Sequence, residues 1–293
     1  MTEPILDAVG VCKTYRGAVE VEVLKGIDLK VFPGELVAVM GPSGNGKTTL
    51  LNCLSGLDEI DGGTVFVDGA DIHAMPDAKR TEHRASRMGF VFQSFNLIPV
   101  FTAAENVELP LLVTGVKAKD ARRRAEQMLE LVGLGHRLRN RPPELSGGEQ
   151  QRVAIARALV TEPAIVWADE PTGNLDSETA GAVLTLLKEV HAAGQTIVMV
   201  THDAVIGRAG TRLVQVTDGR ITYDGAVDAL DLTDAKAVEA PEEPIALDEP
   251  EEPKAPKAPR APRAPKATTA AKATKVAKAA KPARKRTTAS TAK

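Results

Sequence analysis

The sequence predicts an α/β fold with a mixed, mostly parallel sheet, a small antiparallel sheet near the N-terminus and an inserted helical segment. Three observations lead to that prediction. Segments with alternating apolar side chains open the chain, short and almost wholly apolar strands follow them, and helical patterns separate those strands. Strands that alternate with helices are typical of a parallel sheet covered on both faces.

The N-terminal part contains two kinds of strand. The segments ILDAVGVCKTY, VEVLKGIDLKV and TVFVDGADI alternate apolar and polar residues, and the last contains a DG turn, so they predict an antiparallel sheet. Between them, Glu35 to Met40 is an apolar strand, and Thr48 to Leu54 continues as a helix after a glycine-rich turn. The chain therefore predicts a strand, loop and helix unit inserted between the antiparallel strands.

The rest of the folded part alternates helices and strands. A helical pattern extends from about Thr102 to Val132, and a second helix is predicted from Ser177 to Ala193. Three further apolar strands are predicted at Ile165 to Ala168, Thr196 to Val200 and Leu213 to Val216. Ligands of such sheets bind at the carboxyl ends of the strands.

Composition limits the class of protein and divides the chain. The 293 residues include only two cysteines, and no apolar run reaches the roughly 20 residues of a membrane span, so we expect a cytosolic protein. Residues 231–253 carry a net charge of −8 and residues 254–293 a net charge of +13. We expect a folded unit at 1–230, with a helical subdomain at about 95–160, and a disordered tail at 231–293, first acidic and then basic and rich in Lys, Ala and Pro.

The segment GPSGNGKT fits the phosphate-loop pattern G-x-x-x-x-G-K-[ST], and it lies between a strand and a helix as that pattern requires. Its backbone N–H groups would surround the phosphates, Lys47 would reach the β- and γ-phosphates, and the Thr48 hydroxyl would hold Mg²⁺. This predicts a RecA-like P-loop NTPase. The predicted nucleotide-binding residues of the loop are Gly41, Pro42, Ser43, Gly44, Asn45, Gly46, Lys47, Thr48 and Thr49.

Two carboxylates end the apolar strand that begins at Ile165. Side chains alternate faces along a strand, so Asp169 and Glu170 need not share a role. Asp169 would bind Mg²⁺ through water, and Glu170 would polarise the attacking water. The alternative is an acidic turn that caps the following helix.

The stretch LSGGEQQRVAIARAL predicts a second anion site without a lysine. Ser146 occupies the position of a helix N-cap, and two glycines follow it, so backbone N–H groups would point out of an exposed helix start. The residues expected to meet a phosphate there are Leu145, Ser146, Gly147, Gly148, Glu149 and Gln150.

Together these three motifs resemble the ATPase subunit of an ATP-binding cassette (ABC) transporter, over roughly residues 4–225. The resemblance implies that Gln93 contacts Mg²⁺ and faces a membrane partner, and that His202 contacts the γ-phosphate. It also places Asp176 in a loop that crosses a dimer interface. Tyr15 resembles the aromatic residue that stacks on adenine, although a tyrosine packed on its own sheet fits that position nearly as well.

The resemblance also implies which nucleotide each of the two anion sites binds. Two subunits meet head to tail, and the LSGGEQQ helix of each closes over the γ-phosphate held by the other. ATP and Mg²⁺ are the expected cofactors, and an integral membrane permease and a second copy of the chain are the expected partners. The expected location is cytoplasmic, peripheral on the inner face of the cell membrane.

Two segments, FQSFNLIPVFTAAENVELPL and ADEPTGNLDS, are most similar to the lipoprotein-releasing, macrolide-export and cell-division-type branch. Its permeases have few spans and a large external domain, so an FtsX-like permease is expected.

Other readings of the sequence remain open. The basic tail is compatible with a cassette ATPase that acts on nucleic acid or the ribosome, but the single uninterrupted cassette argues against that partner. A solubilising extension is the first alternative role of the tail, followed by contact with an anionic membrane or other polyanion. A regulatory module without hydrolysis is the third class, and the presence of both Glu170 and His202 argues against it. The sequence does not explain why the bulky Trp167 precedes Asp169.

Overall fold

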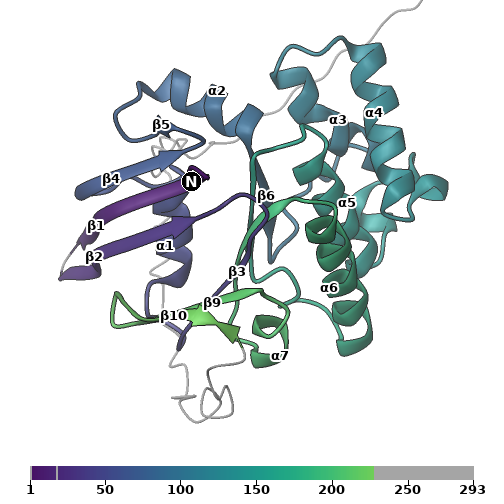
Figure 1. Cartoon of the computed structure of the whole chain (residues 1–293). Helices are drawn as coiled ribbons and strands as arrows, with labels where there is room; N and C mark the ends of the chain where they lie inside the picture. Colours follow the sequence, from purple (N-terminus) through teal and green to yellow (C-terminus); the bar gives the residue numbers. More distant parts are fainter. Residues whose placement is uncertain (1, 18, 228–293) are drawn as a thin grey trace, which may run out of the picture. The chain divides into compact units, whose positions relative to one another are not determined.

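The computed structural model describes residues 2–17 and 19–227, which form two sheets with helices around them (Figure 1). The strands, in chain order, are β1 (Leu6–Arg16), β2 (Glu20–Val31), β3 (Leu36–Met40), β4 (Gly62–Val67), β5 (Ala70–Asp71), β6 (Met88–Phe92), β7 (Ile165–Asp169), β8 (Thr196–Val200), β9 (Arg212–Thr217) and β10 (Arg220–Ala226). The α-helices are α1 (Lys47–Leu54), α2 (Asp77–Arg87), α3 (Ala103–Val113), α4 (Ala118–Leu131), α5 (Gly147–Leu159), α6 (Ser177–Ala192) and α7 (Ala204–Gly207).

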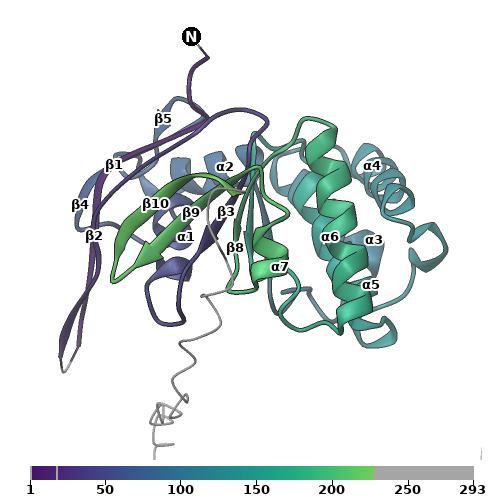
Figure 2. The same ribbon diagram turned by 60° about the horizontal axis from the view of Figure 1, so that its bottom comes forward.

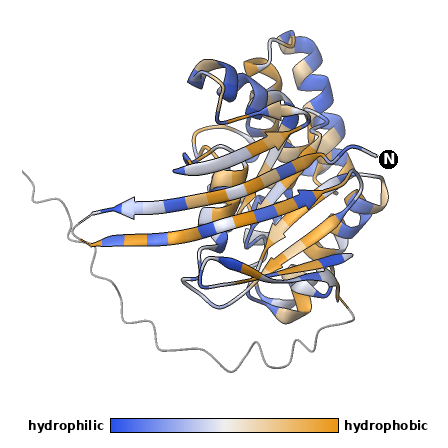
Figure 3. Cartoon of the chain, turned by 60° about the vertical axis from the view of Figure 1, so that its left-hand side comes forward, coloured by the Kyte–Doolittle hydropathy of each residue, from blue (hydrophilic) through white to orange (hydrophobic). Residues whose placement is uncertain are grey.

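The smaller sheet is antiparallel and has the strand order β2-β1-β4-β5. Leu6, Ala8, Val65 and Val67 are buried on its inner face, while alternate residues of the same strands are exposed. Figure 3 shows this alternation of hydrophobic and hydrophilic residues along the strands. The predicted antiparallel sheet is thereby confirmed.

The larger sheet has the order β10-β9-β3-β8-β7-β6 and is parallel except for its β9–β10 edge. The predicted mostly parallel sheet is confirmed, but β10 was not predicted. It pairs with β9 through a turn in which Asp218 and Gly219 both have positive φ, 47° and 74°. An Asp-Gly pair of this conformation is typical of a tight β-hairpin.

The larger sheet is covered on both faces. The cluster on one face contains Leu50 of α1 and Val65 of the smaller sheet, and the cluster on the other contains Val183 and Leu187 of α6. Trp167 belongs to the first cluster, is fully buried, and lies between Phe90 and Val198 of the neighbouring strands. The bulky side chain therefore fills the core between the sheet and α1.

Helices α3, α4 and α5 have a core of their own, which contains Val107, Leu129 and Val153. The helical pattern predicted from about Thr102 to Val132 is divided into α3 and α4, and Gly115, with φ of 86°, lies in the break between them. Figure 2 shows α5 and α6 side by side, and the two helices are in contact.

Three sequence predictions concern the division of the chain into domains. The folded unit at 1–230 and the helical subdomain at about 95–160 remain predictions. The predicted tail at 231–293 lies outside the described residues. Within residues 2–17 and 19–227, no helix is both long and apolar enough to span a membrane.

Candidate nucleotide site

The glycine-rich loop between β3 and α1 folds as a phosphate cradle. Gly41 has φ of 152°, and a Cβ atom there would lie 2.0 Å from the carbonyl oxygen of Val216, so only glycine fits. Gly46, with φ of 86°, is the N-cap of α1, and no side chain caps this helix start. The first N–H groups of α1 therefore have no side-chain cap, which is the condition for an anion to bind there.

Lys47 and Thr48 are the first two residues of α1, and both side chains form hydrogen bonds with other predicted site residues. Lys47 Nζ donates to the carbonyl oxygens of Gly41 and Pro42, at 2.8 and 2.9 Å. Burial lowers the pKa of Lys47, and the nearby charges of Glu170 and Asp169 oppose that shift. Thr48 Oγ1 donates to Asp169 Oδ1 at 3.1 Å. The cation and the hydroxyl thus lie at the carboxyl end of the sheet.

Asn45 joins the glycine-rich loop to a neighbouring turn. It is not among the described residues with positive φ. Its side-chain amide donates to the carbonyl oxygens of Pro42 and Ser43, both at 3.2 Å. Its Oδ1 accepts from the N–H of Asp218 at 2.7 Å, so it joins the loop to the β9–β10 turn.

Asp169 and Glu170 have separate environments. Asp169 ends β7, and burial raises the pKa of its carboxyl group, while the hydrogen bond from Thr48 opposes the shift. Glu170 has φ of 45°, and its Oε1 lies 2.7 Å from Nδ1 of His202. Glu170 follows the last residue of β7 and has a left-handed backbone, so the predicted alternation along a strand does not extend to it. The alternative of an acidic cap on the next helix is wrong, since Asp176 caps α6.

Gln93 and the loop after Glu170 are hydrogen-bonded to each other. Gln93 Nε2 donates to Asn174 Oδ1 at 3.3 Å, and Asn174 Nδ2 donates to the Gln93 carbonyl oxygen at 3.0 Å. A Cβ atom on Gly173 would lie 2.8 Å from Gln93 Nε2, so a larger residue there would displace the Gln93 side chain. Asp176 is exposed, and its carboxylate accepts from the N–H groups of Glu178 and Thr179.

Ser146 is the N-cap of α5, as predicted, and forms a capping box with Glu149. The Glu149 N–H donates to Ser146 Oγ at 3.3 Å, and the Ser146 N–H donates to Glu149 Oε2 at 2.8 Å. One amide of the first turn is therefore used by the cap itself. Arg137 Nε forms a salt bridge with Glu149 Oε1 at 2.9 Å. The Ser146 hydroxyl still has its proton to donate to an anion.

Tyr15 lies at the end of β1 in a polar cluster. Its hydroxyl donates to Asp58 Oδ2 at 2.7 Å, and Lys13 Nζ lies 5.0 Å from the centre of its ring. Burial raises the pKa of the phenol, and the hydrogen bond to Asp58 adds to that shift, while the contact with Thr49 opposes it. The ring is 43% exposed, so it has a face open to a ligand and remains a candidate to stack on a base.

The structure joins some predicted residues and separates others. The phosphate loop, Asp169, Glu170 and His202 are grouped at the ends of β3, β7 and β8. The Ser146 helix start has no hydrogen bond to the phosphate loop within the described residues. Instead, a Cβ atom on Gly147 would lie 3.3 Å from Leu175 and 3.8 Å from the Phe95 ring.

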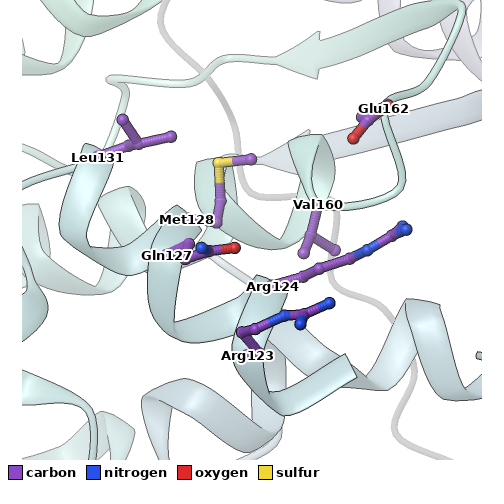
Figure 4. Close-up of a pocket in the computed structure, with 7 residues that line it drawn as sticks. All are labelled: Arg123, Arg124, Gln127, Met128, Leu131, Val160 and Glu162. Carbon is purple, nitrogen blue, oxygen red and sulfur yellow. The ribbon is translucent and has the colours of Figure 1, made fainter. Parts of the chain in front are cut away.

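The sequence reasoning missed three polar residues that hold these loops: Asn174, Gln151 and Arg157. Asn174 follows a glycine in the GNLDS segment and Gln151 ends the LSGGEQQ segment, which were usable signals, whereas nothing local in the sequence marked Arg157. A surface hollow on α4 and beyond the end of α5 is separate from the site, because no predicted site residue lines it (Figure 4). Its lining residues are Arg123, Arg124, Gln127, Met128, Leu131, Val160 and Glu162.

Comparison with known proteins agrees with this arrangement. The family model described as "ABC transporter" matches residues 24–173, from β2 through the phosphate loop, the Ser146 helix and Glu170. The chain belongs to the ABC transporter family. It is an ATP-binding subunit of that family and an ATPase, with transport as its function.

Relatives of this ABC ATPase include transport proteins of several bacteria. An uncharacterised ABC transporter ATP-binding protein of Thermotoga maritima is 50% identical over 74% of this chain and 93% of its own length. The lipoprotein-releasing system ATP-binding protein LolD of Saccharophagus degradans is 47% identical over 77% of this chain and all of its own. The macrolide export ATP-binding/permease protein MacB of Marinobacter nauticus is 44% identical over 75% of this chain, which spans 34% of that larger protein.

A solved structure resembles the ABC ATPase throughout its described part. The ATP-binding cassette MJ0796, described as a dimeric post-hydrolysis state bound to ADP and Pi, has a TM-score of 0.70 and 41% sequence identity. The alignment covers 76% of this chain and 98% of that one.

Proposed function

We propose that two copies of this ABC ATPase enclose two ATP molecules head to tail. Each nucleotide would be held by the phosphate loop of one copy and the Ser146 helix start of the other. The observation that carries the proposal is the separation within one chain: the helix start lies beside Phe95 and Leu175 and has no hydrogen bond to the phosphate loop of its own chain among the described residues. The dimeric state of MJ0796 supports a dimer of this chain.

The proposed roles follow from the chemistry of each group. Lys47 would bind the β- and γ-phosphates, Glu170 would polarise the attacking water, and His202, hydrogen-bonded to Glu170, would meet the γ-phosphate. A helix N-terminus and the Ser146 hydroxyl favour an anion. ADP offers them no γ-phosphate, so ATP binds the closed dimer better than ADP does, and this difference in affinity is what drives closure.

Mg²⁺ fits the same residues. The Thr48 hydroxyl and Asp169 carboxylate oxygens lie 3.1 Å apart, and the Gln93 amide nitrogen is turned to Asn174, which leaves its amide oxygen available. Mg²⁺ is usually held by a few oxygen ligands of the protein together with phosphates and water. We propose that these three residues hold the ion, which would neutralise developing charge on the phosphates.

The partner we propose is a separate permease of the FtsX-like type, with the ATPase peripheral on the inner face of the cell membrane. Two observations support it. The relatives named LolD and MacB belong to lipoprotein-releasing and macrolide-export systems, and MacB combines an ATP-binding part with a permease in one protein. Purification of the tagged full chain from detergent-solubilised membranes should recover an integral membrane protein. Recovery of ribosomes or nucleic acid instead would favour the alternative function.

The dimer is tested with the Glu170→Gln variant, in which ATP should bind without turning over. Light scattering after gel filtration should give twice the mass of the chain with ATP and Mg²⁺, and the mass of one chain with ADP. The matched control is Glu178→Gln, which changes an exposed glutamate of the same region outside the proposed catalytic residues. If Glu170→Gln stayed monomeric with saturating ATP, with its permease supplied, the proposal would be wrong.

A further inference from the structure

The loop after Gln93 has a strained backbone. Phe95 and Asn96 are consecutive residues with φ of 60° and 48°, the left-handed region that residues with a Cβ rarely adopt. Such strain persists only where the surroundings fix the conformation. Within the loop, the Phe95 N–H donates to the Phe92 carbonyl oxygen and the Asn96 N–H to that of Ser94. Neither bond uses the carbonyl group of Phe95 or of Asn96.

Arg157 of α5 satisfies both carbonyl groups. Its Nη2 donates to the Phe95 carbonyl oxygen at 2.8 Å, and its Nη1 donates to that of Asn96 at 2.5 Å. Burial lowers the pKa of this guanidinium, and the hydrogen bonds that it donates within the described residues go to backbone carbonyl oxygens. The rigid fork of an arginine suits two adjacent acceptors, which a lysine does not match. The guanidinium of Arg157 therefore binds the backbone of the Gln93 loop.

The same helix also holds the loop that follows Glu170. Gln151 is fully buried in α5, and its Nε2 donates to the Pro171 carbonyl oxygen at 2.5 Å. The two loops are in turn joined to each other by the paired amides of Gln93 and Asn174. Hydrogen bonds therefore join helix α5, the Gln93 loop and the loop after Glu170 to one another. Helix α5 is the helix that Ser146 caps.

We propose that Arg157 is a positioning residue that fixes the Gln93 loop to the Ser146 helix, so that the two move as one body. The inference rests on the proposed function, in which Gln93 serves the nucleotide of its own chain and Ser146 serves the nucleotide of the partner. A displacement of Gln93 is then transmitted through α5 to the second nucleotide. Arg157 thereby couples the two ATP sites without touching either ATP.

The test is Arg157→Met in the full chain, because methionine keeps much of the apolar stem and removes both donors. The turnover number should fall about tenfold, and the Mg²⁺ concentration for half-maximal activity should rise, because Gln93 is no longer held in place. ATP affinity, measured with a fluorescent analogue, should change by less than about twofold, since Lys47 and its loop are untouched. Amide hydrogen exchange at residues 94–98 should become faster.

A double-mutant cycle separates positioning from a structural effect. If Arg157 acts through Gln93, adding Gln93→Ala to Arg157→Met should lower turnover little further, whereas independent effects would multiply. The matched control is Arg84→Met, because Arg84 of α2 also donates to a backbone carbonyl oxygen, that of Gly56, at 2.7 Å. The control should lose stability without changing the Mg²⁺ requirement.

Several outcomes would overturn the inference. Multiplicative effects in the cycle would do so, as would an Arg157→Met variant with the wild-type turnover and Mg²⁺ requirement. If Arg157→Met does not fold, Arg157→Lys replaces it, and wild-type amide protection at 94–98 together with a wild-type Mg²⁺ requirement would then refute the role. If a protein with the native Arg157 did not form dimers with ATP, the proposed function would be refuted instead, whatever the Arg157 variants show.

Discussion

Two capping boxes in this chain permit a controlled test of Ser146. Thr102 caps α3 and Ser146 caps α5, each with a glutamate three residues later. The N–H to hydroxyl distances are 3.2 and 3.3 Å, and both reciprocal N–H to carboxylate distances are 2.8 Å. Thr102→Ala and Ser146→Ala therefore remove closely similar local interactions, but only Ser146 is proposed to meet a phosphate.

The structure gives the expected size of each effect. Loss of an N-cap hydrogen bond lowers the free energy of unfolding by about 1 kcal/mol, so both variants should melt about 2–4 °C below the wild type. Ser146→Ala should also lose a hydrogen bond to the charged γ-phosphate of the partner's ATP, which contributes about 1.5–3 kcal/mol. Its turnover should consequently fall about 10- to 100-fold, while that of Thr102→Ala stays close to the wild-type value.

The assay is steady-state phosphate release at saturating ATP, with thermal unfolding recorded on the same samples. Trp167 is the only tryptophan of the chain and is fully buried, so its fluorescence reports the folded fraction. Equal losses of turnover in Thr102→Ala and Ser146→Ala would mean that capping alone explains the effect. Wild-type turnover in Ser146→Ala would refute its proposed contact with ATP.

Three further predictions follow from the site. Lys47→Ala should lower ATP affinity by about 10- to 100-fold, because a charged hydrogen bond to phosphate is lost, and calorimetry that shows wild-type affinity would contradict the phosphate-loop assignment. Glu170→Gln should bind ATP normally and lose nearly all turnover in single-turnover experiments, whereas unchanged turnover would remove Glu170 from its role. The Ser146 N–H holds the pKa of Glu149 below its ordinary 4.5, so this carboxylate stabilises the fold above pH 4.5 and loses that effect as the pH falls through its lowered pKa. Urea unfolding should accordingly show Glu149→Gln less stable than wild type at pH 7, with a difference that narrows as the pH falls below 4.5, and a constant difference would contradict the capping interaction.

Local signals were sufficient to predict most of the fold. The apolar strand at β3, the glycine-rich loop and the helix after it are contiguous, so periodicity and turn chemistry specify them together. The same holds for the hydrophobic run of β7 and for the Ser146 cap. The missed strand β10 had a usable signal in Asp218-Gly219, because an Asp-Gly pair between apolar segments predicts a hairpin.

The contacts that hold the site together were not predictable from local signals. Arg157 reaches carbonyl groups 61 and 62 residues earlier in the chain, and Asn174 pairs with Gln93 across 81 residues. An arginine late in an amphipathic helix is usually a solvated or dipole-stabilising residue. Only the fold shows that its guanidinium reaches a loop whose backbone is left-handed. Every residue has a backbone carbonyl group, so the residue type does not show which carbonyl groups accept a hydrogen bond from a side chain. Sequence reasoning therefore could not find these contacts.

The central claim is that each ATP is held by two different copies of the chain, and mixing two defective variants tests it most directly. In a Glu170→Gln background, Ser146→Arg copies and Lys47→Ala copies should each retain no radiolabelled ATP through gel filtration. Mixed together, they should retain ATP in mixed dimers, because the intact Lys47 of one copy then faces the intact Ser146 of the other. The absence of retained ATP from the mixture, or retention by the Ser146→Arg copies alone, would contradict the claim.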